Sequence, residues 1–207
     1  MTREDEHPHG ITQSIAMVVV KPEGWRWVSH EDWWREVQDW KPNPADDDWA
    51  WALGAMDWSQ FTLLSGLSKY PEDHPTPSPS ARIWACRNDF NFDPHEAIRD
   101  QLEATEGFLG GLDVRSGPAP TRLGGHDGYG ATYTSVMDQE QFGRYLELAE
   151  FVVVQLGEQM IVASFEIPAD LGTDEDRREL MEIRASVRFT VNEDCSGAAT
   201  VPESPGG

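Results

Sequence analysis

The sequence predicts one α+β domain, an antiparallel β-sheet with helices packed on its faces. Two apolar runs within residues 145–168 are separated by a polar break at Gly157-Glu158, which is the pattern of a long β-hairpin. Other strand-like segments follow one another along the chain, and only a few segments have helical periodicity. The length of 207 residues also suits a single domain.

The predicted hairpin fixes its own register. Gly157 suits the first position of a two-residue type II′ turn, because glycine accepts the positive φ required there, and this turn pairs Leu156 with Gln159. The pairs that follow are Val154–Ile161, Val152–Ala163 and Leu148–Ile167 on one face, and Val153–Val162 and Phe151–Ser164 on the other. Toward the open end the faces become mixed and carry Glu147, Glu150 and Glu166. We therefore expect a central position in a sheet that is covered on both faces.

The chain before residue 41 predicts a leader, a strand and a helix. Residues 1–13 are polar and acidic, and we expect them to be disordered. Residues 14–20 form an apolar strand that ends in a turn at 21–24. Ser29 suits a helix N-cap, with Asp32 as an acidic variant of the capping box. The helix should lie across a hydrophobic surface, because one of its faces is apolar. That face carries Trp33, Val37 and Trp40 or Trp34.

Residues 41–58 form a Trp-rich insertion. Two prolines end the preceding helix, and Asp46-Asp47-Asp48 then precedes Trp49, Trp51 and Trp58. Eight of the nine tryptophans fall between residues 25 and 58, so they serve either as core filler or as an aromatic surface with an acidic rim. Three adjacent charges seldom enter a core, and we therefore expect part of this segment to be exposed.

Two strands and a helix are predicted next. The strands cover residues 60–68 and 81–88, and a proline-rich loop joins them. In the second strand, alternation places Ile83 and Ala85 on the face opposite to Trp84 and Cys86. Asp93 then caps a helix over 93–109, with Pro94 at its first position and Glu96 in the first turn.

The remaining elements are two strands before the hairpin and a helix after it. The strands are expected at 114–123 and 131–136, on either side of a glycine-rich stretch. The last helix begins after Thr173 and is expected to reach Arg188, and residues 192–207 are expected to be disordered. Residues 14–191 then form one domain, in which the helices at 93–109 and 173–188 should pack on the same face of the sheet.

Composition limits the function classes. Lys and Arg number 16 against 37 Asp and Glu, a formal net charge of −21 that disfavours nucleic acid and anionic membranes and favours basic partners. Cys86 and Cys195 lie too far apart in sequence for a metal-ligand motif, and two cysteines provide no disulfide framework. The first residues lack a basic n-region, an apolar h-region and a lipobox cysteine, and no apolar run approaches the roughly 20 residues of a membrane span. These features predict a cytoplasmic location and no membrane insertion.

No segment of the sequence identifies a reaction. The glycine-rich residues 124–130 lack the lysine and the following helix of a phosphate-binding loop, so we interpret them as a turn. His126 beside Asp127 has the composition of a base held by a carboxylate, but adjacent residues in a turn point apart. His7 and His9 lie in the leader, which offers no fixed geometry to a metal. We expect no catalytic residues, no metal and no cofactor.

Several structural motifs together resemble a known fold. These are Pro-x-Gly-Trp after the first strand, the PHEAIRDQL helix, the Gly-Gly-x-x-Gly entry to a strand, a hairpin ending in Ile-Pro, and a final ELMEIRASVRF helix. Over residues 15–189 the chain resembles the fold shared by the photosystem II extrinsic protein PsbP, the Ran-binding nuclear import factor and the actinobacterial LpqN-type lipoproteins. It departs from them in lacking the lipobox cysteine and in carrying the insertion at 41–58. The resemblance implies a PsbP-like fold and the role of an adaptor, a chaperone or an extrinsic subunit.

Three function hypotheses follow. The first is a non-catalytic binding module, adaptor or chaperone-like protein that engages a protein or peptide partner with basic and apolar groups. Its predicted contact residues are Trp33, Trp34, Asp46, Asp47, Asp48, Trp49, Trp51 and Trp58. The second is a small-molecule or metal-dependent enzyme that uses His126 and carboxylates such as Asp46, Asp47 and Asp48. The third is a self-associating structural subunit. A buried carboxylate with a shifted pKa in a deep cavity favours the enzyme, whereas an open apolar groove favours the adaptor.

Overall fold

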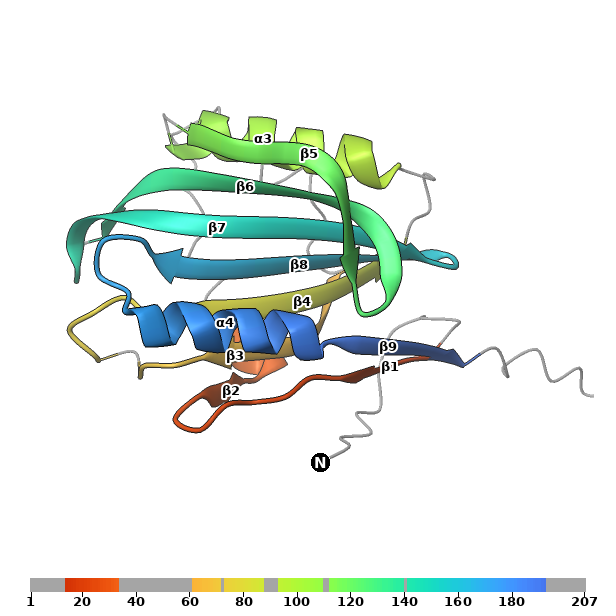
Figure 1. Ribbon diagram of the computed structural model, residues 1–207, viewed down its shortest axis with the longest axis horizontal. Helices are drawn as coiled ribbons and strands as arrows, with labels where there is room; N and C mark the ends of the chain where they lie inside the picture. The colour runs from red at the N-terminus through yellow and green to blue at the C-terminus, as the bar shows by residue number, and fades with distance from the viewer. Residues whose placement is uncertain are drawn as a thin grey trace, which may run out of the picture.

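A seven-stranded antiparallel sheet is the centre of the structure (Figure 1). The computed structural model describes residues 14–33, 61–71, 73–87, 93–109, 112–139 and 141–192. The strands of the sheet, in spatial order, are β2 (Arg26–Val28), β3 (Phe61–Ser68), β4 (Ser80–Arg87), β8 (Gln159–Pro168), β7 (Gly143–Leu156), β6 (His126–Gln139) and β5 (Leu112–Leu123). A separate ribbon pairs β1 (Ser14–Val18) with β9 (Arg188–Asn192). The helices α3 (Pro94–Leu109) and α4 (Asp174–Ser186) complete these elements, and the α+β prediction of a mainly antiparallel sheet is confirmed.

The predicted hairpin is confirmed residue by residue. β7 and β8 join at Gly157, whose φ is +60°, and Leu156 pairs with Gln159. All the predicted pairs are present, including Val154 with Ile161. β8 and β7 also occupy the middle of the strand order, as their apolar pattern on both faces predicts.

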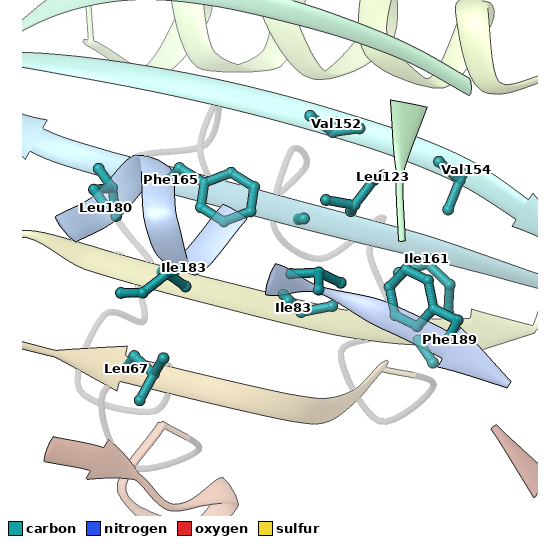
Figure 2. Close-up of a cluster of buried hydrophobic side chains, with 14 of the residues drawn as sticks. Leu67, Ile83, Leu123, Val152, Val154, Ile161, Phe165, Leu180, Ile183 and Phe189 are labelled. Carbon is teal, nitrogen blue, oxygen red and sulfur yellow. The ribbon is translucent and has the colours of Figure 1, made fainter. Parts of the chain in front are cut away.

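The two helices cover opposite faces of the sheet. α4 packs through Leu180 and Ile183 onto the face that carries Val152 and Ile161, which we call the α4 face (Figure 2). α3 packs through Ile98 onto the opposite face, in one cluster with Val153, Met160 and Ala131, and we call this the α3 face. The prediction that both helices share one face is wrong. Because alternate residues of the hairpin are apolar on both sides, each side needs its own cover.

The final helix is shorter than predicted, and a strand follows it. α4 ends at Ser186, and Val187 has an extended backbone with φ −55° and ψ 132°. Val187 and Phe189 are buried and Val191 is partly buried, so the apolar period changes from helical spacing to every second residue. This alternation suits a strand, and β9 pairs with β1 across the same apolar cluster that α4 covers. The expected helix to Arg188 and Phe189 is therefore corrected.

The glycine-rich stretch continues the sheet as well as forming a turn. Gly124 and Gly125 form the turn with positive φ, whereas Gly128 and Gly130 lie inside β6, which begins well before the expected residue 131. A Cβ at Gly128 would overlap the backbone carbonyl of Val153 on β7. β6 and β7 approach so closely here that only glycine fits at residue 128, although glycine is otherwise unfavourable inside a strand.

A buried ionic network fastens α4 to the sheet. Thr173 caps the helix in a capping box with Asp176, which confirms the predicted start. Lys69, directly after β3, lies 2.6 Å from Asp176 and 2.7 Å from Glu179, and the indole of Trp25 donates to the same Glu179 oxygen at 2.9 Å. Burial opposes ionisation of the two acids, but the hydrogen bonds from Lys69 hold the pKa values of both below their usual range.

None of the helices that the structure describes is long and apolar enough to cross a membrane.

Replacing Val153 or Ile161 with Asp should destabilise the fold severely. Both side chains are buried on opposite faces of the hairpin, so each variant places an unpaired carboxylate in a different core. We expect a loss of about 3 kcal/mol or more in the free energy of unfolding, measured by urea denaturation. The same change at Leu146, which is 42% exposed on β7, is the matched control and should cost much less. A soluble Val153→Asp variant with the wild-type melting temperature would show that the hairpin is misplaced.

Replacing Lys69 with Met should weaken the packing of α4 on the sheet and lower the free energy of unfolding. The substitution leaves Asp176, whose side chain is 1% exposed, without its cation, and we expect a cost of about 3 kcal/mol at neutral pH. Because the pKa of Asp176 is lowered in the folded state, its stabilisation is present above its unfolded pKa and is lost as the pH falls. The difference between Lys69→Met and wild type should therefore shrink toward pH 3. The matched control is Arg178→Met, which removes the exposed pair with Glu175 and should change stability by less than about 0.5 kcal/mol.

Candidate functional site

The structure describes only one of the predicted contact residues, Trp33. Residues 30–33 are helical, and Ser29 caps them by accepting a hydrogen bond from the Asp32 amide at 3.0 Å, as predicted. Trp33 is 3% exposed and packs with Leu63 and Trp84 on the α3 face. It therefore lies against a hydrophobic surface, as expected of this helix. The other predicted contact residues lie outside the described residues, namely Trp34, Asp46, Asp47, Asp48, Trp49, Trp51 and Trp58.

His126 and Asp127 do not form a dyad. Asp127 is exposed and pairs with Arg122 on β5 at 2.9 Å, whereas the His126 ring lies 6.3 Å from the ring of Phe189. Neighbouring residues of a strand point to opposite faces, and these two side chains accordingly meet different partners. Within the described residues no group of three or more potential metal ligands is close enough to hold an ion.

A polar cluster occupies the α3 face near the open end of the hairpin. Its members come from β4, β6, β7 and β8, and we call them the Glu147 cluster: Ser80, Arg82, Tyr133, Tyr145, Glu147, Ser164 and Glu166. The strand registers bring them together, because Arg82 pairs with Ser164 and Ser80 pairs with Glu166. Glu147 is two residues from Ala149, the partner of Glu166, and so lies diagonally across from that acid.

The charges of the cluster do not balance. Arg82 Nη1 lies 3.0 Å from Glu166 Oε2, and the Ser80 hydroxyl donates to the same oxygen at 2.9 Å. The side chains of Arg82 and Glu166 are 25% and 20% exposed, so this pair reaches solvent on one side. Within the described part of the chain, no salt bridge reaches Glu147. Two carboxyl groups therefore share one guanidinium group.

This imbalance shifts the protonation equilibria of the cluster. Burial, together with the nearby Glu166 carboxylate, raises the pKa of Glu147 to about 8, against the opposing effect of Arg82. Burial and the same two acids also raise the pKa values of Tyr133 and Tyr145. The folded protein thus favours the neutral form of Glu147 over its carboxylate more strongly than water does.

Sequence reasoning named Glu147 and Glu166 but assigned them no role. The correct hairpin register already placed both on the face of Val153 and Val162, so alternation alone was a sufficient signal for their proximity. Arg82 could not be added in the same way, because its place depends on the pairing of β4 with β8, two strands far apart in sequence. The burial that shifts the pKa comes from tertiary packing and has no local signature.

The fold and this cluster define an antiparallel sheet protein with a charge-imbalanced polar site on one face. No protein-family model and no curated protein sequence matches the chain. Among solved structures, the chain is similar to LpqN of Mycobacterium tuberculosis, described as involved in cell envelope biogenesis, with 15% sequence identity and a TM-score of 0.48 over 88% of this chain and 87% of LpqN. It is also similar to a protein of Bacteroides thetaiotaomicron VPI-5482, with 16% identity and a TM-score of 0.35 over 64% of this chain and 42% of that protein. These are distant structural similarities, and the PsbP-like assignment stays a prediction.

Replacing Glu147 with Gln should stabilise the protein at alkaline pH. The unfolded chain ionises this residue near its ordinary pKa of 4.5, whereas the folded chain keeps the proton up to a pKa of about 8. Wild-type stability therefore falls as the pH rises between these values, and the glutamine variant escapes this loss. We expect the melting temperature of Glu147→Gln to exceed that of wild type near pH 8.5 and to approach it near pH 4.5. Glu158→Gln, at an exposed turn position, is the matched control and should follow wild type. Equal melting temperatures of wild type and Glu147→Gln at both pH values would contradict the raised pKa of Glu147.

Proposed function

We propose that the chain is a non-catalytic binding module that engages a protein or peptide partner with basic and apolar groups. The observation that supports it is the charge imbalance among the described residues of the Glu147 cluster, where Arg82 is the cation near both Glu147 and Glu166. A half-buried carboxyl group that has no salt bridge to a described residue is costly to ionise, and a basic group of a partner relieves this cost. Binding of such a group is thus the event that the cluster favours most.

The surroundings of the cluster suit a partner that also has apolar groups. Phe142 and Phe151 are partly exposed, and each packs on a buried tyrosine: Phe151 stacks on Tyr133 at 6.2 Å, and Phe142 meets Tyr145 edge to face at 6.5 Å. Aromatic side chains beside a charged group are typical of interaction hot spots. The net charge of −21 adds long-range attraction for a basic partner.

The acidic Trp-rich segment is a second proposed contact. Trp49 and Trp51, beside Asp46-Asp47-Asp48, stay predicted to engage apolar and basic groups of the same partner. An extended chain places residues two apart on one side, so Trp49 and Trp51 would present a common surface. We also propose that this binding takes place in the cytoplasm.

An enzyme is the second candidate function, and one observation favours it. The raised pKa of Glu147, about 8, is the kind of shift seen in general acids and bases. Structural ion-pair networks also shift pKa values, so the raised pKa alone does not identify an enzyme. The tyrosines and serines near Glu147 also have no histidine or lysine beside them, within the described residues of the cluster, that would activate them as nucleophiles. The two functions differ in what happens to a bound molecule, because a binding module returns it unchanged. Mass spectrometry of a peptide recovered after prolonged incubation separates them.

A peptide of alternating Lys and Leu should bind the full chain more tightly than a Glu/Leu peptide of equal length. We expect at least about tenfold preference at low salt, which should weaken with added salt because exposed acids contribute through long-range attraction. Fluorescence anisotropy of labelled peptides measures both effects. The control is a Ser/Leu peptide, which tests the apolar contribution alone. Equal affinity for all three peptides, or no binding to any, would overturn the proposed function.

A further inference from the structure

β1 has the sequence of a covered strand but lies at an open edge. Residues 15–20 are all apolar, and an unbroken apolar run is typical of a strand that has cover on both faces and a neighbour on each side. Among the described strands, however, β1 pairs only with β9. In Figure 1, β9 continues from α4 and β1 lies along its outer side. The other edge of β1 is therefore open to a further strand.

Alternation divides this segment into an inner and an outer face. The inner side chains pack against the apolar cluster of the α4 face, and they are Ile15, Met17 and Val19. On the outer face Ala16 is exposed, and Val18 and Val20 are 57% and 59% exposed. The outer side chains and the open backbone edge of β1 together form one surface without charge, which we call the β1 edge.

The edge strands of the seven-stranded sheet have features that prevent pairing between chains, and β1 has none of them. β5 carries two register shifts, prolines at 118 and 120, and an exposed ion pair between Asp113 and Arg115, while β2 has only three residues. Bulges, prolines, charges and short length are the usual means of protecting an edge strand. β1 pairs with β9 without a register shift, and residues 14–20 contain no proline, glycine or charge. The β1 edge is therefore suited to pairing.

We propose that the β1 edge is a homodimer interface, at which the β1 strands of two copies pair antiparallel and join the two ribbons into one four-stranded sheet. Identical strands paired in this way are related by a two-fold axis. With the axis at Ala16, residue 15 of one copy lies opposite residue 17 of the other, and residue 14 lies opposite residue 18. None of these pairs brings two charges together. Because both copies use the same edge, the assembly closes at the dimer.

Charge favours a second copy as the occupant of this edge. With a formal net charge of −21, two copies repel each other over most of their surfaces. Residues 14–22 and 186–192 contain no acid and two cations, Lys21 and Arg188, so two ribbons meet without opposing carboxylates. Arg188 pairs with Val18, so both β1 strands separate the two arginines, which lie at least about 14 Å apart and are screened at physiological salt. The basic partner proposed above finds no acid on the ribbon and binds elsewhere.

The size of the interface predicts a weak and reversible dimer. β1 has five residues, so the paired edge is about 17 Å long and the interface lies at the low end of specific contacts, below about 1,200 Å². We expect a dissociation constant of about 10–100 μM. Added salt should strengthen the dimer, because it screens the repulsion between two acidic chains. The Lys/Leu peptide should show the opposite dependence, so salt distinguishes this interface from the proposed binding function.

Sedimentation velocity of the full chain over a range of concentrations tests the dimer. We expect wild type to change from monomer to dimer between about 1 and 300 μM, and to do so at lower concentration in higher salt. Ala16→Lys places like charges opposite each other and should raise the dissociation constant at least about tenfold. Thr190→Lys is the matched control, because it adds the same charge on the same face of the ribbon but on β9. Melting temperatures show whether both variants fold, and Val18→Lys replaces Ala16→Lys if that variant does not.

Two results of sedimentation would overturn the inference. The first is a chain that stays monomeric at the highest concentration in both low and high salt. The second is a dimer that Ala16→Lys weakens no more than Thr190→Lys does. The Lys/Leu peptide should still bind Ala16→Lys as it binds wild type, since the substitution leaves the Glu147 cluster unchanged.

Hydrogen exchange locates the interface independently. The amides of β1 that point away from β9 should exchange rapidly in the monomer and become protected as the concentration of wild type rises. In Ala16→Lys this protection should be lost, and the amides of β5 should not respond to concentration in either protein. A dimer that leaves the β1 amides unprotected would place the interface elsewhere. Protection that does not depend on concentration would show that another segment of the same chain covers the edge, and either result overturns the inference.

Discussion

The two-sided apolar character of the β7–β8 hairpin is the constraint on which the rest of the structure depends. Alternation sends Val152 and Ile161 to one face and Val153 to the other, and all three are buried. Because both faces are apolar at the middle of the hairpin, other elements of the chain must pack on each face to exclude solvent. α4 and the β1–β9 ribbon cover one face, and α3 covers the other (Figure 1). The three-layer arrangement is thus a consequence of one strand pair.

The same alternation explains where the Glu147 cluster lies. Toward the open end of the hairpin the residues on the α3 face change from apolar to acidic, while the flanking strands keep them partly enclosed. Glu147 and Glu166 are thereby held close together with one arginine, and the burial that stabilises the middle of the hairpin becomes a cost at its end. The strands thus continue past the last apolar residues of the α3 face, and the acidic residues beyond them are partly enclosed by the neighbouring strands.

Local patterns in the sequence predicted much of this fold. Features that depend on contacts between distant parts of the chain were not predicted. The hairpin register and the cap at Thr173 follow from a few neighbouring residues, and both are confirmed. The strand at 188–192 was missed because it exists only through pairing with β1, at the other end of the chain. The side of the sheet that each helix covers was also misassigned, because an apolar stripe specifies burial but not direction. Glu147 was visible as a residue, yet only tertiary packing sets its protonation.

Two ionic clusters of this protein use similar side chains, but the pKa values of their carboxyl groups shift in opposite directions. In the first, Lys69 lies against Asp176 and Glu179, hydrogen bonds reach both acids, and their pKa values fall. In the second, the carboxyl groups of the described residues outnumber the cation, and the pKa of Glu147 rises. A network that only fastens α4 gains by complete pairing, since each unmade bond costs stability. The described residues of the Glu147 cluster lack this complete pairing, and its cost in free energy is the physical basis of the proposed binding function.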